Sequence, residues 1–251
     1  ELISSYVNNG QLSAQFNFNV YDVALPTFLD ANMSFESLDA EIKKSFLFYG
    51  ENNLMGNIMD SHDKNRFMAF ADGDLNVTQW SAIEEGWNNP PKVDNPNSYE
   101  KAKLYYAYLN TIPGLPVIYY GSEFGMTGAS DPDNRRMMRF GKELTVYEKK
   151  MLEDVRKIIN LRKNHPSLRY GDFYTLAANE NIYSYIRSDV NERILVVLNK
   201  SNKSVNAELK TPAIYKVNSA TDLLINEKVD VSDNLIKITL SPVSYRFIRL
   251  D

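Results

Sequence analysis

The stretch that decides the fold is NIMDSHDKNR, residues 57–66, which continues an apolar run that begins at Leu54. Its last seven residues hold one imidazole, two carboxylates and one guanidinium. We predict a β-strand over 54–59, because the run is short, apolar and followed at once by polar residues. Ionisable residues at the carboxyl end of a strand are typical of a (β/α) barrel, whose active site lies at that end.

The segments before this stretch are expected to form a strand and a helix. Apolar residues occupy every second position over Phe16–Val20, which is the spacing of a half-buried strand. From Phe35 to Tyr49 they recur every three or four positions, which predicts an amphipathic helix. Ser34 is a suitable N-cap for this helix, and Gly50 is the residue type that commonly ends one.

The segments after the stretch repeat the alternation. A long polar loop over 71–97 leads to a helix that begins near Ser98 and stops before Pro113. We predict a strand over Pro116–Tyr120 and then a helix that Thr145 and Glu148 open as a capping box. Strands that alternate with helices indicate a parallel sheet.

Three strand–helix units cannot close an eight-stranded barrel, and an open parallel sheet of three strands would have two bare edges. We therefore expect an N-terminal half of the barrel to lie outside this chain. The fold class that we predict is α/β, with residues 1–168 as the last three strand–helix units of a (β/α)8 barrel.

From about Gly171 the pattern changes to short β runs separated by polar turn residues. Short strands at regular spacing without helices predict an antiparallel β-sandwich over residues 169–251. The expected strands are 181–187, 193–199, 206–209, 214–217, 235–240 and 245–250.

Composition excludes several classes of function. The 251 residues are 43% hydrophobic and 24% charged with a net charge of −4, so no basic surface is expected to bind nucleic acid. No apolar run approaches the roughly 18 residues of a membrane span. There is no cysteine, and His62 and His165 are the only histidines, so no thiolate or histidine-rich metal site is expected. Phosphate-binding glycine motifs are also absent from the sequence.

A second motif follows about fifty residues after the first. It consists of PGLPVIYYGSEFGMTG over 113–128 and DPDNRR over 131–136. Together with SHDKNR over 61–66, it resembles two regions of the α-amylase superfamily, glycoside hydrolase family 13. The wording of the last-strand motif is similar to that of bacterial amylases and neopullulanases, including surface starch-degrading amylases.

The resemblance implies hydrolysis of α-glucans with retention of configuration. Such enzymes use a carboxylic acid, a nucleophilic carboxylate and an oxocarbenium-like transition state. By resemblance Asp63 is a third carboxylate, which holds the distorted sugar ring, and His62 donates a hydrogen bond to the same sugar. Arg66 is expected to pair with a catalytic carboxylate. From the residues alone, Asp63 could be a helix or turn cap at a strand end, His62 could be a satisfied buried histidine, and Arg66 could form a surface ion pair.

Four further residues are candidates for sugar binding. Asp131 and Arg135 resemble a pair that binds sugar units toward the non-reducing end, and a salt bridge within their loop is the alternative. Tyr120 is expected to line the site or to anchor its loop. Trp87 could stack on a glucose face or pack within its own loop.

Neither the nucleophile motif nor the acid/base motif of that family is found, so this chain is expected to be inactive alone. The resemblance also implies calcium, with ligands mostly outside this chain, and favours an extracellular, periplasmic or cell-surface location. Three alternatives stay open: a related isomerase or transglycosylase, a non-catalytic amylase-like subunit that only binds, and a stand-alone carbohydrate-binding module over residues 169–251.

Overall fold

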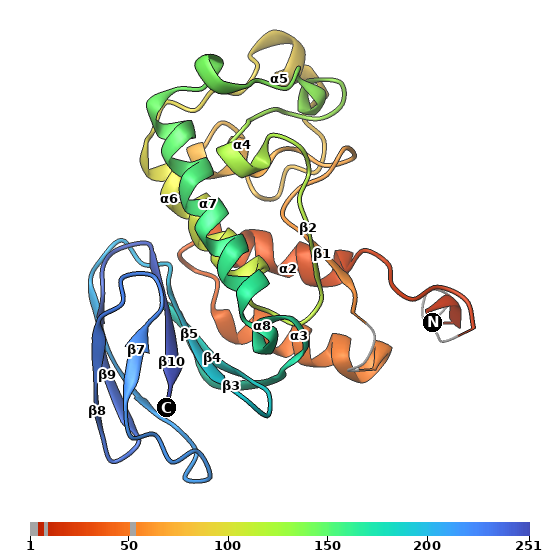
Figure 1. Ribbon diagram of the computed structural model, residues 1–251. Helices are drawn as coiled ribbons and strands as arrows, with labels where there is room; N and C mark the ends of the chain where they lie inside the picture. Colours follow the sequence, from red (N-terminus) through yellow and green to blue (C-terminus); the bar gives the residue numbers. More distant parts are fainter. Residues whose placement is uncertain (1–4, 8–9, 51–53) are drawn as a thin grey trace.

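The computed structural model describes residues 5–7, 10–50 and 54–251. A helical part is followed by an all-β part (Figure 1). The described helical part runs in the order α2 (Phe18–Leu29), α3 (Phe35–Tyr49), β1 (Gly56–Ile58), α4 (Phe67–Asp72), α5 (Ile83–Asn88), α6 (Asn97–Leu109), β2 (Leu115–Val117), the 3-10 turns η1 (Ser122–Phe124), η2 (Asp133–Arg135) and η3 (Gly141–Glu143), α7 (Val146–Asn164) and α8 (Pro166–Tyr170).

The two strands of the helical part pair in parallel, as the alternation of strands and helices predicts. Gly56 lies opposite Leu115, and Ile58 lies opposite Val117. Phe16 adds a parallel bridge to Gly56. Both strands are shorter than the predicted ranges, because the pairing is confined to three residues on each strand.

The predicted strand over Phe16–Val20 is wrong from Phe18 onward. Helix α2 begins there, and the side chain of Asn17 caps it by accepting a hydrogen bond from the Val20 backbone N–H at 3.4 Å. Asn17 is itself buried and donates to Ser45 Oγ at 2.8 Å. The cap therefore outweighs the alternating pattern, and only Phe16 pairs as a strand residue does.

The helix ends that the sequence predicts by capping are confirmed. Ser34 accepts from the second residue of α3, and Gly50 ends that helix with a φ of 85°. At α7, the Glu148 backbone N–H donates to Thr145 Oγ1 at 3.2 Å and the Thr145 N–H donates to the Glu148 carboxylate at 2.8 Å. This reciprocal pair satisfies two N–H groups that the first turn leaves without helical partners.

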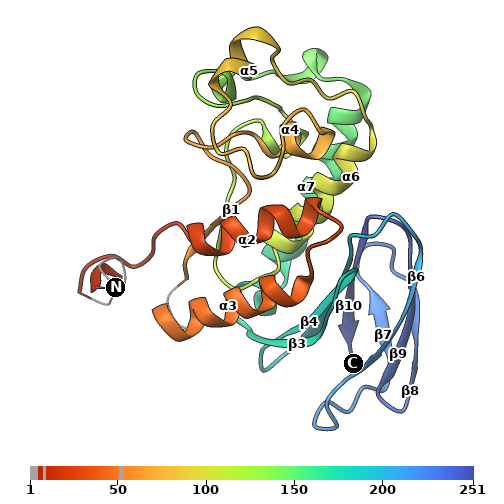
Figure 2. The ribbon, with the colours of Figure 1, turned by 180° about the vertical axis from the view of Figure 1, so that it is seen from behind.

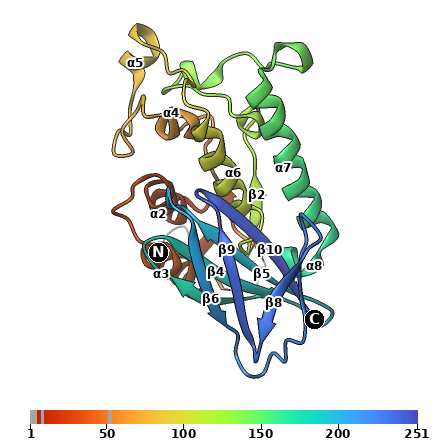
Figure 3. The same cartoon turned by 90° about the vertical axis from the view of Figure 1, so that its left-hand side faces the viewer.

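The all-β part is an antiparallel sheet with strand order β3-β4-β5-β10-β7-β8-β9-β6. Its core joins the two ends of the sheet, since Ile186 and Leu195 pack with Leu209 and Ile236. Figure 3 shows β6, β8 and β9 crossing β4 and β5, which gives the two layers of a sandwich. The strands are β3 (Asp172–Ala178), β4 (Ile182–Ser188), β5 (Arg193–Asn199), β6 (Val205–Lys210), β7 (Ala220–Asp222), β8 (Lys228–Ser232), β9 (Leu235–Leu240) and β10 (Ser244–Leu250).

One predicted strand of this part is wrong. Residues 214–217 form no strand, and the Tyr215 backbone N–H instead donates to the Pro212 carbonyl at 2.9 Å, which closes a turn. Strands β3, β7 and β8 were not predicted. β7 is only three residues long, and β8 alternates lysine, aspartate and serine with two valines, so neither has a strong apolar pattern.

The two parts share one apolar core. Phe28 of α2, Phe35 of α3 and Tyr108 of α6 belong to the same buried cluster as Tyr183 and Tyr185 of β4. The rings of Phe35 and Tyr183 stack with centroids 5.4 Å apart. Figure 2 shows α3 beside the strands β3 and β4, with α2 on the far side of α3 from the sheet. The sheet thus completes the core of the helical part.

Three basic side chains near this contact donate to main-chain carbonyls, and two of them, Arg187 and Lys200, do so from the all-β part to the helical part. Arg162 of α7 reaches Asn110 and Gly114 after α6, whereas Arg187 of β4 reaches Thr111. Both also donate to the carbonyl of Leu168, and burial lowers the pKa of each guanidinium to about 10. Lys200, in the turn after β5, donates to the carbonyls of Thr27, Asp30 and Met33, which lie in the last turn of α2 and in the connection from α2 to α3.

Candidate functional site

Asp63 lies in the turn that follows β1, and 68% of its side chain is exposed. One carboxylate oxygen is 3.1 Å from His62 Nε2, and the other is 3.7 Å from a terminal nitrogen of Arg135. The Nε of Arg135 is 3.2 Å from the carboxylate of Asp131. The structure therefore brings four of the predicted site residues into one chain of charged contacts, which we call the Asp63 cluster (His62, Asp63, Asp131 and Arg135).

The Asp63 cluster joins the loops that follow two neighbouring parallel strands. Asp63 follows β1, and Arg135 stands in η2 of the loop after β2. Parallel strands bring their carboxyl ends to the same edge of a sheet, which is why residues 72 positions apart in the sequence meet here. The pairing of Asp131 with Arg135 shows that a salt bridge within this loop exists, and a contact with sugar stays a prediction.

Arg66 lies beneath this cluster with its side chain fully buried. Its guanidinium donates to the carbonyls of Asn134 at 2.8 Å and Tyr120 at 2.7 Å and to Ser122 Oγ at 3.0 Å. The ring of Tyr119 lies over it, 3.9 Å from the guanidinium carbon to the ring centroid. These contacts tie Arg66 to the loop after β2, so its closest described partners are carbonyls and a hydroxyl rather than Asp63.

Asp60, at the end of β1, is buried beside Arg66. Its carboxylate accepts from Ser122 Oγ at 2.6 Å and from the Phe67 backbone N–H at 3.2 Å. Burial raises the pKa of Asp60, and the charge of Arg66 and the two hydrogen bonds only partly oppose this shift. Because both Asp60 and Arg66 hydrogen-bond to Ser122 Oγ, they connect the segment that follows β1 with the segment that follows β2.

Lys64 anchors the other side of the turn. Its ammonium lies 4.9 Å from the ring centroid of Trp80 and 5.4 Å from those of Phe18 and Tyr21. The nearby Asp22 has its pKa raised by burial, while Lys64 opposes the shift. Trp80 is thus engaged in holding the loop, although 63% of it stays exposed.

Tyr120 and Trp87, the remaining candidates, lie at the edge of this arrangement. The Tyr120 hydroxyl donates to the carbonyl of Arg136 at 2.9 Å, so the residue does anchor its loop. Trp87 is exposed on α5. A Cβ added at the neighbouring Gly86 would come within 2.9 Å of Asp133 Cβ, so α5 lies tightly against the loop after β2. Sugar contacts of both aromatic residues stay predictions.

Three residues of this region make contacts that the sequence alone did not predict: Ser122, Tyr119 and Asn134. Each lies in the second motif, but their partners are 50 or more residues away in the sequence. A pattern confined to one segment could not have identified those partners.

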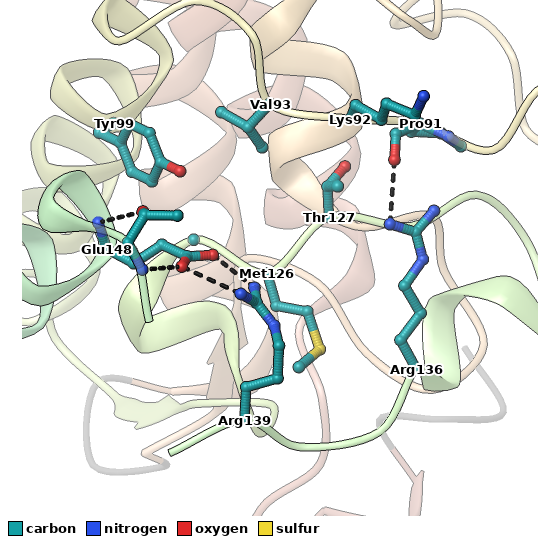
Figure 4. Close-up of a pocket in the computed structure, with 11 residues that line it drawn as sticks. Pro91, Lys92, Val93, Tyr99, Met126, Thr127, Arg136, Arg139 and Glu148 are labelled. Carbon is teal, nitrogen blue, oxygen red and sulfur yellow. Dashed lines mark hydrogen bonds and ion pairs between the residues drawn. The ribbon is translucent and has the colours of Figure 1, made fainter. Parts of the chain in front are cut away.

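A separate cavity of about 250 Å³ lies beside the loop after β2 (Figure 4). Arg139 and Glu148 form an ion pair on one side, and the hydrogen bond to Glu148 raises the pKa of Arg139. On the other side Arg136 donates to the carbonyl of Pro91 at 2.9 Å and pairs with Asp133. None of the predicted site residues lines this cavity, so the Asp63 cluster is the better candidate for the chemistry.

Calcium binding stays a prediction from the family resemblance. Over 5–7, 10–50 and 54–251, no three acidic or histidine side chains gather closely enough to hold a cation. Within the same residues, none of the helices combines the length and the apolar character that crossing a membrane requires.

Comparisons with known proteins agree with the two-part organisation. The sequence model of the alpha amylase catalytic domain matches residues 1–169, and that of the maltogenic amylase C-terminal domain matches residues 174–247. A cyclomaltodextrinase of Geobacillus thermopakistaniensis is 28% identical over 244 residues, which is 96% of this chain and 37% of that protein. A cyclomaltodextrin glucanotransferase of Geobacillus stearothermophilus is 35% identical over 147 residues, 58% of this chain and 16% of that protein.

A solved structure shows the same fold. The crystal structure of an alpha-amylase from Geobacillus thermoleovorans complexed with acarbose has a TM-score of 0.81 and 25% identity. The match covers all of this chain and 50% of that one. The chain thus spans about a third of the cyclomaltodextrinase and half of the alpha-amylase.

Proposed function

The chain belongs to the α-amylase family of glycoside hydrolases, and from that membership we propose that it supplies part of the active site of an enzyme that hydrolyses starch or maltooligosaccharides. The single observation that carries the proposal is the Asp63 cluster. An exposed carboxylate at the end of a parallel strand is held between an imidazole and a guanidinium, at the place where barrel enzymes bind substrate.

Asp63 would act on the sugar at the cleavage point. Each of its carboxylate oxygens has one neighbour in the cluster, and its exposure leaves lone pairs for sugar hydroxyls. A carboxylate that accepts hydrogen bonds from a distorted ring, and whose charge faces the developing oxocarbenium ion, lowers the energy of that transition state. His62 would donate a hydrogen bond to the same ring, and Arg135 and Asp131 would contact sugar units farther from the bond.

The nucleophile and the acid/base catalyst would come from another segment. The parallel pair of β1 and β2, with Phe16 bridged to β1, presents strand edges that further barrel strands would pair with. We propose that this segment is the N-terminal half of the barrel, and that any calcium is held mostly by its residues. A location outside the cytoplasm stays a prediction from the family.

The decisive test is release of reducing sugar from soluble starch. We expect none from the chain alone, and activity when the N-terminal half of the barrel is supplied as a second chain. Asp63→Asn should then lower kcat by on the order of 100-fold or more, because it removes a charge that acts mainly on the transition state. Asp233→Asn, an exposed substitution in the β-sandwich, is the matched control. Hydrolysis by the unmixed chain would contradict the division of roles.

Transglycosylation is a second candidate, and the similarity to a cyclomaltodextrin glucanotransferase favours it. Product analysis on maltoheptaose separates the two reactions, since a hydrolase yields only shorter oligosaccharides and a transferase also yields longer or cyclic ones. A subunit that only binds would retain acarbose or maltoheptaose and yield neither kind of product.

A further inference from the structure

Asn134 is placed to control the position of Asp63. Its side chain is buried, and its amide nitrogen donates to the carbonyls of His62 and Lys64, both at 2.9 Å. These two carbonyls belong to the residues on either side of Asp63. One side chain from the loop after β2 therefore fixes the backbone both before and after the carboxylate that follows β1.

The main chain of Asn134 is also held by a hydrogen bond. Its carbonyl accepts from Arg66 Nε at 2.8 Å, and the Arg66 backbone N–H donates to the carbonyl of Gly128 at 2.9 Å. Arg66 also donates to the carbonyl of Tyr120, which follows β2 by three residues. Asn134 and Arg66 thus form a closed set of hydrogen bonds between the two loops.

The nitrogen and the oxygen of the Asn134 side-chain amide differ in their hydrogen bonding. This oxygen is buried without a hydrogen-bond partner. A buried acceptor without a partner is unfavourable. A rotation of the amide by 180° would face its oxygen toward two carbonyls, so the orientation with the NH₂ group toward them is the favourable one. The residue is therefore present for its two donors.

We propose that Asn134 is a positioning residue that holds Asp63 in the orientation needed to bind the sugar ring. The proposal rests on the function proposed above for Asp63. Asn134 would touch no substrate, and its effect would pass through the His62 and Lys64 carbonyls alone. No other contact in the described turn holds both sides of Asp63 through one side chain.

Asn199 offers a matched control for the test. Its buried amide also donates to two carbonyls, those of Lys203 at 3.0 Å and Ser241 at 2.8 Å, but it lies in the β-sandwich. Asn134→Ala and Asn199→Ala remove the same pair of donors from buried sites. Asn134→Asp keeps the shape but places a carboxylate against the two carbonyls of the turn.

The first measurement needs no sugar. Backbone ¹⁵N relaxation of the 251-residue chain gives the order parameter of the Asp63 amide, which we expect to fall from about 0.85 to below about 0.6 in Asn134→Ala. Asn199→Ala should leave it unchanged. In Asn134→Asp it should rise again as the pH is lowered, because protonating the new carboxyl restores one donor. An Asp63 amide that is equally ordered in all three variants would overturn the proposal.

The second measurement is hydrolysis of soluble starch by the mixture of the chain with the N-terminal half of the barrel. Displacing a catalytic group by about 1 Å costs on the order of 100-fold in rate. We expect Asn134→Ala to lower kcat by roughly that factor with KM changed less than about threefold, since the displaced group acts in the transition state. Asn199→Ala should retain its kcat. A retained kcat in Asn134→Ala would count against a positioning role for Asn134. If the unsubstituted mixture hydrolyses nothing, the proposed function fails, while the relaxation data still decide the role of Asn134.

Discussion

Replacing Lys200 by methionine should separate the contribution of one half-buried ammonium from that of the apolar core between the two parts. Lys200→Met keeps most of the aliphatic stem and removes all three donors. Those donors serve the carbonyls of Thr27 in the last turn of α2, of its C-cap Asp30 and of Met33 in the connection to α3. The perturbation is therefore confined to the end of α2 and the connection that follows it.

The magnitude follows from two opposing effects. A hydrogen bond from a charged donor typically contributes roughly 1.5 to 3 kcal/mol to the free energy of unfolding. Half-burial of the ammonium opposes this gain, and the lowered pKa of Lys200 shows that desolvation outweighs the charges of Asp30 and Glu180. We expect a net loss of about 2 to 3 kcal/mol in the free energy of unfolding. For a chain of this size that corresponds to a Tm lower by roughly 5 to 10 °C.

Urea denaturation followed by far-UV circular dichroism measures this loss directly. Lys203→Met is the matched control, because Lys203 stands in the same turn and its side chain is exposed. We expect that variant to lie within about 0.5 kcal/mol of the unsubstituted chain. A Lys200→Met chain as stable as the Lys203→Met chain would show that the carbonyls of α2 find water instead, and the reasoning would fail.

Three further substitutions test other contacts. Arg187→Met should lose roughly 3 kcal/mol in urea denaturation, because it removes the side-chain donor to the carbonyl of Thr111, a buried residue, and to that of Gly171; a loss below about 1 kcal/mol would refute this account. Phe35→Ala should lose about 3 to 5 kcal/mol, since the ring is fully buried against Tyr183, and an exposed-ring change such as Phe140→Ala should cost little. Asp60→Asn concerns pH: burial raises the folded-state pKa of Asp60 above its unfolded value, so ionisation above the folded pKa costs stability that is recovered as the pH falls through it. The stability deficit of Asp60→Asn should therefore be smaller at pH 7 than near pH 4, and a deficit independent of pH would contradict the raised pKa.

The sequence predicts this fold best where the determining contacts are local. The ends of α3 and α7 follow from Ser34, Gly50 and the Thr145–Glu148 pair, whose partners lie within four residues along the chain. The strand over Phe16–Val20 is the exception: the cap at Asn17 is also a local contact, but the alternating apolar pattern favours a strand over the same residues.

The candidate site was predictable in outline only. Asp63 and Arg135 could be placed together because both follow parallel strands. The amide of Asn134 and the hydroxyl of Ser122 could not, since each bonds to residues about 60 to 70 positions earlier. Such contacts depend on how the loops fold over the strand ends, and no periodicity or motif encodes that geometry.

The aromatic core between the helices and the β-sandwich bears on how such proteins change in evolution. Recombination between relatives would exchange the β-sandwich near residues 169–173, where the sequence divides most clearly. The rings of Phe35 and Tyr183 lie on opposite sides of that division and stack on each other. A chimera joined there would inherit two halves of a core that never adapted to one another. The boundary between the two sequence models is thus not a boundary of stability, and the two parts should unfold as one unit.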